Sequence, residues 1–330
     1  MPEFRLNLIS REWVVLNAER ARGPAEFRRG VTRSPKPSYL DSCPFCPGNE
    51  GAPENELYRV SDNGGWKIRV LKNKYPVLSM EGEPVRTMDG PMRMVSGVGL
   101  HEVIVESPLH DTSPAFFELT HMVKLLSIYR SRFNNAYLDK RVEHVIIFKN
   151  HGPASGTSIE HPHSQLVATP VVPARFRDRI LAAMQYFDDT GKCIKCDMIE
   201  KERADSERVI LETEHFITFI PFAALSPFHL WIFPKRHMAV FSGINEDEIK
   251  DLALHMKTIL HKLHVGLDDP DYNYSISSSA TRHSKSEFSH WYISIIPRLI
   301  ETTGFELGSG IYVNPSMPEK NAEFLRAIEE

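Results

Sequence analysis

The sequence His161-Pro162-His163-Ser164-Gln165-Leu166-Val167-Ala168 places two imidazoles at the start of an apolar segment. Pro162 favours an extended backbone at the residue before it, and residues i and i+2 of an extended chain face the same side. We therefore expect His161 and His163 to be neighbours at the mouth of a strand. One ring can be held by a metal ion or a hydrogen bond while the other attacks phosphorus. The alternative is a pair of structural histidines at a strand end.

The first half of the chain carries a series of motifs around this segment. Cys43-Pro44-Phe45-Cys46 comes first and is followed by an expected strand at 101–106, which leads to His110. A helix is expected next, with Ser113 as its N-cap and Phe116 among the residues on its buried face. A strand at 143–148 then leads to the strand that begins with the two histidines.

The second half repeats this order of motifs. Cys193-Ile194-Lys195-Cys196 precedes an expected strand at 230–233, which leads to His237. A helix capped by Asn245 follows, with Glu248 placed for a capping box. Strands are then expected at 272–277 and 290–296. The later part of the helix carries His255, His261 and His264, which we expect on its solvated face.

The shared order and spacing predict the fold class. The chain is expected to be an α+β protein formed by tandem duplication, with antiparallel sheets and helices packed on their faces. We place the two halves at residues 1–175 and 176–330. Each half pairs two thiols with two imidazoles, a donor set that suits zinc in a closed tetrahedron without a position for a catalytic water. The sequence therefore predicts two structural zinc ions per chain, with the ligands Cys43, Cys46, His110 and His161 at one site and Cys193, Cys196, His237 and His290 at the other.

Two alternatives remain for these residues. A Cys-x-x-Cys motif can be a redox dithiol, but Cys43 lies among proline, glycine and asparagine, as in a zinc knuckle, and does not open a helix after a strand. His237 and His290 could be buried polar residues without a metal ion. One position breaks the repeat, because Tyr292 stands where the first half has His163. We therefore expect one nucleophile and one catalytic centre per chain.

Composition excludes several classes of protein. The 330 residues include 42% hydrophobic and 25% charged residues, and the formal net charge is -4. No apolar run approaches the length of a membrane span, and the first residues lack the layout of a secretion signal. We expect a cytoplasmic protein that binds no membrane. The acidic charge and the lack of a basic, aromatic-rich stripe argue against the non-enzymatic alternative, a zinc-stabilised protein that binds nucleic acid.

The motifs resemble those of the galactose-1-phosphate uridylyltransferase family of the histidine-triad superfamily. That family carries an Asn-x-Gly-x-x-x-Gly-x-Ser loop followed by His-Pro-His-x-Gln, and the matching residues here are Asn150, Gly152, Gly156, Ser158, His161, His163 and Gln165. The resemblance implies histidine-triad-like halves and a homodimer. It also implies ping-pong transfer, in which His163 attacks the α-phosphorus of a nucleoside diphosphate sugar and forms a nucleotidyl-histidine. A sugar 1-phosphate or inorganic phosphate then accepts the nucleotide.

The same resemblance suggests which residues contact the substrate. His163, Gln165 and Ser158 are the catalytic candidates, with the latter two as donors to phosphoryl oxygens. For binding the nucleotide sugar, the candidates are Arg20, Arg22, Asn73, Asn150, Gly156, Phe305 and Gly308.

Some features depart from the uridylyltransferase pattern. Tyr292, the thiols of Cys193 and Cys196, Ser164 and the segment Asn73-Lys74-Tyr75-Pro76 resemble a branch that includes a plant enzyme acting on ADP-glucose with phosphate as the acceptor. The candidate functions are therefore uridylyl transfer to a hexose 1-phosphate and adenylyl transfer to phosphate. A further enzymatic alternative is a dinucleoside polyphosphate hydrolase or phosphorylase.

Overall fold

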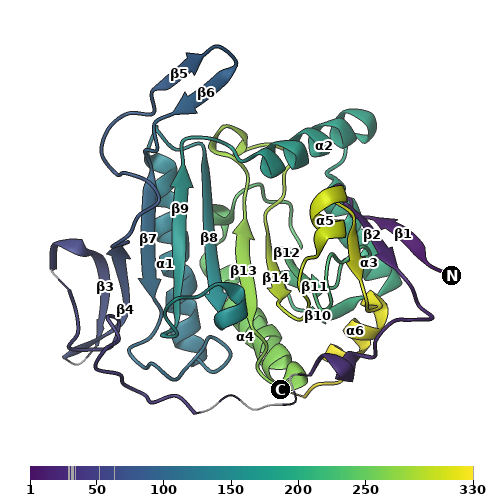
Figure 1. The fold of residues 1–330 in the computed structure, drawn as a ribbon, viewed down its shortest axis with the longest axis horizontal. Helices are drawn as coiled ribbons and strands as arrows, with labels where there is room; N and C mark the ends of the chain where they lie inside the picture. Colours follow the sequence, from purple (N-terminus) through teal and green to yellow (C-terminus); the bar gives the residue numbers. More distant parts are fainter. Residues whose placement is uncertain (29, 31–32, 34, 52, 63, 330) are drawn as a thin grey trace.

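The computed structural model describes residues 1–28, 30, 33, 35–51, 53–62 and 64–329. Its centre is a ten-stranded sheet in which every neighbouring pair of strands is antiparallel (Figure 1). The first half contributes, from the outer edge inward, β3 (Glu56–Asp62), β4 (Gly65–Lys72), β7 (Leu100–Val105), β9 (His163–Thr169) and β8 (His144–His151). The second half contributes, from the centre outward, β13 (Tyr272–Ser277), β14 (Tyr292–Pro297), β12 (Leu230–Pro234), β11 (Phe216–Phe219) and β10 (Val209–Glu212).

The two half-sheets join into one, at strands β8 and β13. These strands pair antiparallel, with Tyr272 opposite His151 and Ile276 opposite Ile147. The sequence predicted the antiparallel α+β architecture and its duplication, and the sheet confirms both. The edge-to-edge junction also removes one exposed edge from each half, which otherwise would present unpaired backbone groups.

Helices α1 (Leu119–Leu138) and α4 (Glu246–Leu267) cover one face of this sheet and pack against each other (Figure 1). The main core lies between them and the strands, where apolar residues of both halves form one cluster. Because alternate residues of a strand point to opposite faces, the other face remains available for a site.

The start of the first helix differs from the prediction. Helix α1 begins at Leu119, with Glu118 as its N-cap, and not at Ser113. Residues 113–117 form a turn in which the Phe116 N–H donates to the Ser113 carbonyl, and Phe116 is 51% exposed. The reason is geometric: His110, in the loop after β7, lies beside Cys46, so the chain needs several residues to reach the helical face.

The start of helix α4 agrees with the prediction. Asn245 caps α4, its side chain accepts from the Asp247 and Glu248 N–H groups, and the capping box with Glu248 is present. The expected solvated face is wrong for His255, which is fully buried. Its ring nitrogens contact the hydroxyls of Thr213 and Thr218, so the polar ring is satisfied inside the core.

The remaining elements surround the central sheet. A three-stranded sheet contains β1 (Glu3–Leu6), β2 (Trp13–Leu16) and β15 (Tyr312–Asn314), while β5 (Arg86–Asp89) and β6 (Met92–Val95) form a projecting hairpin (Figure 1). The other α-helices are α2 (Ala174–Thr190), α3 (Ile194–Asp205), α5 (Gly304–Ser309) and α6 (Pro318–Arg326). The 3-10 helices are η1 (Pro24–Phe27), η2 (Pro53–Asn55), η3 (Pro153–Ser155), η4 (Phe241–Gly243) and η5 (Thr281–His283). Within the described part of the chain, no helix combines the length and the apolar character that crossing a membrane would require.

Candidate active site and metal clusters

His163 is the first residue of β9 and faces a cavity on the side of the sheet opposite α1. Its side chain is 8% exposed, and its Nδ1 lies 2.9 Å from the His161 carbonyl oxygen. A carbonyl only accepts, so Nδ1 carries the proton and Nε2 keeps its lone pair. Burial lowers the pKa of His163, the hydrogen bond to His161 opposes this shift, and the Lys149 ammonium adds to it. The ring is therefore neutral at pH 7.

The cavity has a volume of about 820 Å³. Strands β4, β7 and β9 form its floor, and the loop that carries the first Cys-x-x-Cys motif forms a wall. Apolar side chains such as Phe45, Leu71 and Val103 line it together with polar groups at one end. Mostly apolar walls with a few fixed polar groups are typical of a small-ligand site. Four of the predicted site residues line this cavity: Asn73, Ser158, His163 and Gln165.

A chain of hydrogen bonds fixes the orientation of the Gln165 amide. The Val77 N–H donates to His101 Nδ1 at 3.1 Å, so the proton of this neutral imidazole must be on Nε2. His101 Nε2 lies 2.8 Å from Gln165 Oε1 and 2.9 Å from Asn73 Nδ2, and of these two atoms only the Gln165 oxygen can accept its proton. Asn73 Nδ2 lies 3.4 Å from the same oxygen. With its oxygen occupied by donors, Gln165 has its NH2 group left for a ligand. His101 belongs to none of the sequence motifs, so this role could not be predicted from them.

A buried polar network lies beneath β9, on the helical face of the sheet. Lys149 Nζ contacts Glu106 Oε2 at 2.6 Å and the His163 carbonyl oxygen at 3.0 Å. The Tyr129 hydroxyl donates to Glu106 Oε1 at 2.9 Å and lies 2.7 Å from the hydroxyls of both Ser164 and Tyr274. The Lys149 and Glu106 side chains are 2% and 0% exposed. The Lys149–Glu106 pair holds the backbone at His163 from the helical face of the sheet, and no sequence motif predicted it.

The loop before the histidines is held by residues from the second half. Gly152 has a φ of 81°, and a Cβ there would lie 2.3 Å from Asp271 Oδ1, so only glycine fits. The Ala154 N–H donates to Asp271 Oδ2 at 2.5 Å. Asn273 Nδ2 donates to Asn150 Oδ1 at 2.8 Å and to the Ser155 carbonyl at 2.9 Å. Asn150 therefore orients the loop, and neither it nor Gly156 lines the cavity.

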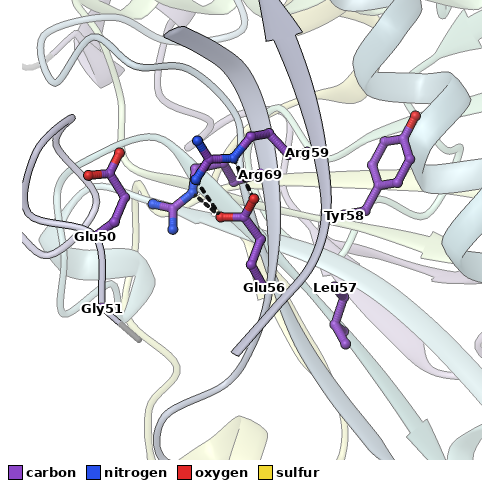
Figure 2. Close-up of a pocket in the computed structure, with 7 residues that line it drawn as sticks. All are labelled: Glu50, Gly51, Glu56, Leu57, Tyr58, Arg59 and Arg69. Carbon is purple, nitrogen blue, oxygen red and sulfur yellow. Dashed lines mark hydrogen bonds and ion pairs between the residues drawn. The ribbon is translucent and has the colours of Figure 1, made fainter. Parts of the chain in front are cut away.

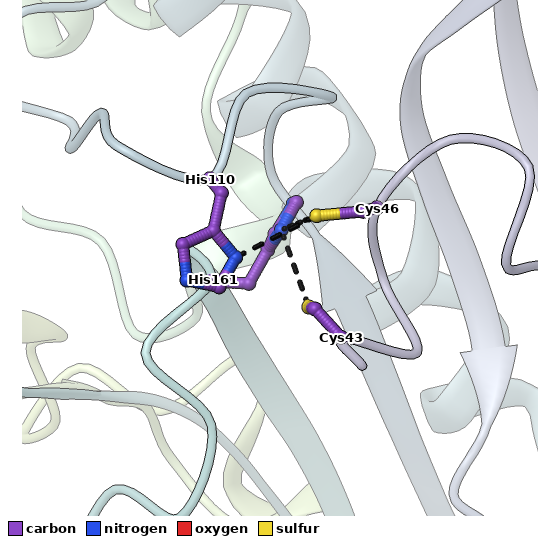
Figure 3. A group of neighbouring side chains, drawn as sticks. All are labelled: Cys43, Cys46, His110 and His161. Carbon is purple, nitrogen blue, oxygen red and sulfur yellow. Dashed lines mark hydrogen bonds between the residues drawn. The ribbon is translucent and has the colours of Figure 1, made fainter. Parts of the chain in front are cut away.

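The first Cys2His2 set converges on one point (Figure 3). Cys46 Sγ lies 3.6 Å from both His110 Nδ1 and His161 Nδ1, and Cys43 Sγ lies 3.7 Å from His161 Nδ1. In a zinc tetrahedron, bonds of about 2.3 Å to sulfur and 2.0–2.1 Å to nitrogen place these atoms about 3.6 Å apart. His161 Nε2 lies 2.7 Å from the Ser107 carbonyl, the kind of outer partner that orients a metal-bound imidazole. These residues fit a zinc ion.

The second Cys2His2 set also converges, at the N-terminus of α3. Cys196 Sγ lies 3.4 Å from His237 Nδ1 and from His290 Nδ1. His237 Nε2 lies 3.3 Å from the Ser286 carbonyl, whereas the buried Nε2 of His290 has no hydrogen-bond partner within the described part of the chain. The donor set fits the same type of ion, in a more exposed setting.

A smaller hollow of about 280 Å³ lies between β3, β4 and the loop at Glu50 (Figure 2). Arg69 lines both this hollow and the large cavity. Its Nε contacts Glu56 Oε2 at 2.7 Å, and Arg59 Nε contacts Glu56 Oε1 at 2.5 Å. Hydrogen bonds from Arg59 lower the pKa of Glu56 against the effect of burial, and Arg69 lowers it further. The carboxylate therefore compensates much of the positive charge at this end of the cavity.

Four predicted substrate contacts lie elsewhere in the chain. Arg22 lies over the Phe27 ring, with its backbone N–H donating to the Pro315 carbonyl, and Arg20 is exposed nearby. Phe305 and Gly308 are on the short helix α5, beside β15 in the second half (Figure 1). None of these four residues lines the cavity at His163.

The corresponding face of the second half is filled with side chains. Trp231, Phe233 and Tyr292 pack there with Phe219 and Ile217, and α3 covers them through Ile199. Tyr292 stacks on Phe233 at a centroid distance of 5.0 Å. The aromatic cluster occupies the volume that the first half keeps open above His163.

Comparison with known proteins gives consistent matches over the whole chain. The family models named "Galactose-1-phosphate uridyl transferase", N-terminal and C-terminal domains, match residues 1–173 and 180–330. An ADP-glucose phosphorylase of Arabidopsis thaliana is 36% identical over 99% of this chain and 93% of its own length. A galactose-1-phosphate uridylyltransferase of Thermotoga maritima is 29% identical over 100% and 99%. The crystal structure of the Arabidopsis ADP-glucose phosphorylase with bound ADP-glucose superposes with a TM-score of 0.82 at 34% identity, covering 100% of this chain and 99% of that one.

Proposed function

This chain belongs to the galactose-1-phosphate uridylyltransferase family of nucleotidyltransferases, and we propose that it transfers a nucleoside monophosphate through a covalent bond to His163. The observation that carries the proposal is the hydrogen bond from His163 Nδ1 to the His161 carbonyl. It leaves an unprotonated Nε2 on a buried ring that lines a ligand-sized cavity. A neutral imidazole in a fixed orientation is an effective nucleophile near pH 7.

The reaction has two displacement steps. In the first, the Nε2 lone pair forms a bond to the α-phosphorus of a nucleoside diphosphate hexose, and the bond from that phosphorus to the bridging oxygen breaks. Hexose 1-phosphate leaves with the electron pair. In the second, an oxygen of the acceptor phosphate bonds to the same phosphorus, and His163 regains its lone pair.

The polar end of the cavity suits the charge that develops on phosphorus. The NH2 group of Gln165 and the hydroxyl of Ser158 are the donors for the non-bridging oxygens. Asn73 lies beside them, where it can reach the ribose, and Phe45 and Leu71 offer apolar surface for the base. Asn150 and Gly156 act through the loop that presents Ser158.

Similarity favours ADP-glucose as the donor and inorganic phosphate as the acceptor. The plant ADP-glucose phosphorylase shares 36% of residues with this chain, compared with 29% for the Thermotoga uridylyltransferase. The second half also has Tyr292 in place of a further histidine, a pattern that resembles the branch of the plant enzyme. UDP-glucose with galactose 1-phosphate is the second candidate pair, because the Thermotoga enzyme matches over its whole length.

We assign zinc to both Cys2His2 sets, with residues 1–175 and 176–330 as the two histidine-triad-like halves. Zinc in a closed tetrahedron supplies structural cross-linking and no catalytic water. At the first set, Cys43, Cys46 and His110 would hold His161 in place, and its carbonyl fixes the tautomer of His163. At the second set, Cys193, Cys196, His237 and His290 would join α3 to β14.

We also propose that the active unit is a homodimer. Arg20, Arg22, Phe305 and Gly308 lie away from the cavity of their own chain, so any contact they make with substrate has to be made in the site of a partner. Phe305 is 53% exposed, which leaves its ring available for such a contact. Sedimentation equilibrium tests the assembly, and a monomer that retains full activity would contradict it.

Covalent labelling tests the proposed chemistry. ADP-glucose or UDP-glucose carrying 32P at the α-phosphorus is mixed with the enzyme without an acceptor. We expect acid-labile, base-stable label on the protein, none on His163→Ala, and full labelling of the control His283→Ala. Label that survives His163→Ala identifies a different nucleophile and refutes the proposal. A chase with phosphate or galactose 1-phosphate shows which acceptor removes the label, and the nucleotide that labels faster identifies the donor.

A further inference from the structure

We propose that the second half contains a separate anion-binding site, which holds one phosphate group between α2, α3 and the end of β13. The site is a small cavity lined by Arg179 and Lys195 from the two helices, by His290 and Tyr292 at the start of β14, and by serine side chains. It goes beyond the proposed nucleotidyl transfer and does not depend on His163.

Three side chains that carry N–H donors line this cavity. Arg179 Nη1 lies 3.2 Å from the Tyr292 hydroxyl, and Lys195 Nζ lies 5.7 Å from the centroid of the same ring, so the two cations flank Tyr292. His290 is 2% exposed, and its buried Nε2 has no hydrogen-bond partner among the described residues. Because His290 Nδ1 faces Cys196 Sγ, Nε2 is the nitrogen that carries a proton when Nδ1 binds a metal ion.

The lining offers no negative charge to match these donors. Among the described residues that line the cavity, none is an aspartate or a glutamate. The rest of the polar lining comprises Ser277, Ser278, Ser279 and Ser289, whose hydroxyls can each donate or accept. Two cations, a buried N–H donor and a group of hydroxyls match the oxygens of a phosphate group, which are acceptors with negative charge.

The position in the duplicated fold supports the same conclusion. Gln165 pairs with Phe148 and with Val103, and Ser294 pairs with Ser275 and Trp231 in the matching places. The end of β13 therefore corresponds to the end of β8, which opens the active-site loop. In the first half this end of the sheet carries His163 and opens into the large cavity, and the second half keeps it polar although the aromatic cluster fills the corresponding volume.

The size of the cavity restricts the ligand. Its volume of about 30 Å³ leaves no room for a nucleoside or a sugar. Arg179 and Lys195 are only partly buried. Oxygens of one phosphate group can thus enter, while the remainder of a larger molecule stays in solvent. Inorganic phosphate and the terminal phosphate of a sugar 1-phosphate share this chemistry.

The test uses the metal-loaded protein and the substitution Arg179→Gln. Arg175→Gln is the matched control, because Arg175 is an exposed arginine of the same helix that does not line the cavity. Zinc content and melting temperature show that both variants keep the second metal cluster. Crystals are soaked in selenate, whose anomalous signal locates the anion, and solution binding of inorganic phosphate and of glucose 1-phosphate is measured by titration calorimetry.

We expect a selenate peak between Arg179, Lys195 and His290, in addition to any peak at His163. Calorimetry should show, besides any binding at His163, an anion site that is lost or weakened about tenfold or more in Arg179→Gln and unchanged in Arg175→Gln, since charge-assisted hydrogen bonds carry the affinity. Binding of both ligands assigns a site for any terminal phosphate, whereas binding of phosphate alone assigns a site for the free ion. Selenate found only at His163, or identical titrations for the two variants, overturns the proposal. Nucleotide labelling of His163 is measured separately, so failure of this site and failure of the proposed function are distinguishable.

Discussion

Replacing His101 with phenylalanine is expected to slow nucleotidyl transfer through the loss of a fixed orientation at Gln165. In the native chain, the Val77 N–H sets the tautomer of His101, and His101 Nε2 then donates to Gln165 Oε1 at 2.8 Å. The phenylalanine ring keeps the shape but loses the donor. The Val77 backbone can turn to water, because this residue is 70% exposed.

The size of the effect follows from the bonds that change. Loss of one neutral hydrogen bond costs about 1 kcal/mol, which corresponds to roughly fivefold in rate if the bond only preorganises Gln165. Gln165→Glu keeps the acceptor for His101 but replaces the NH2 donor with an oxygen facing the phosphoryl group. Loss of one such oxyanion donor costs about 10²–10³ in rate. In the Gln165→Glu background, His101→Phe should therefore change the rate less than it does in the native enzyme.

Single-turnover labelling of His163 measures this directly, with a series of nucleotide-sugar concentrations to separate the rate constant from binding. A residue that positions a transition-state donor should lower the rate constant and leave the half-saturating concentration nearly unchanged. Equal effects of His101→Phe in the native and Gln165→Glu backgrounds would refute action through Gln165. A loss of melting temperature that parallels the loss of rate would show a role in stability instead.

Three other outcomes are expected. Lys149→Met leaves Glu106 buried without its partner and should lower the free energy of unfolding by about 3–5 kcal/mol. Adding Glu106→Gln should restore part of this stability. Urea denaturation that shows no loss of stability in Lys149→Met contradicts the assigned pair. Burial lowers the pKa of His163 below the usual histidine value of about 6.5. The labelling rate should therefore be flat near pH 7 and fall only as the pH drops through a midpoint below that value. A midpoint at or above it in a single-turnover pH series would contradict a buried, neutral nucleophile. Tyr292→His should leave the number of labelled histidines at one per chain, because aromatic side chains fill the space above that position. A second labelled histidine found by peptide mapping would refute this packing argument.

The sequence specified those parts of the fold that depend on local patterns. Asn245 and Glu248 form the predicted capping box because that motif needs only residues within one turn. The repeated order of motifs gave the duplication for a similar reason. The start of α1 was predicted wrongly, because Ser113 and Pro114 are equally good signals for a turn, and only the path from His110 to the helical face excludes a helix there. His255 was placed on the solvated face because neither the strand that carries Thr218 nor its register was known.

The candidate site likewise contains residues that sequence spacing predicts and residues that depend on strand register. His161, His163 and Gln165 share one strand entry, so sequence spacing was enough to bring them together. His101 reaches Gln165 from a neighbouring strand, and its role depends on a register that the sequence does not reveal. Lys149 did carry a signal, because it shares strand parity with Val145 and Ile147, which are buried. A charged residue at such a position requires a buried partner, but the sequence could not identify Glu106.

The duplication explains why two similar halves produce one centre. His229 lies two residues before Trp231, as His101 lies two residues before Val103, and its Nε2 is 2.9 Å from Ser294 Oγ. The second half thus retains the histidine that orients a polar group, although that group is the hydroxyl of a serine and not an amide. What it lacks is space, since Trp231 replaces the smaller Val103 on the floor and joins the aromatic cluster under α3. The proposed reaction therefore requires an open volume above the strand as well as a nucleophile, and the second half has Tyr292 and a filled volume in their places.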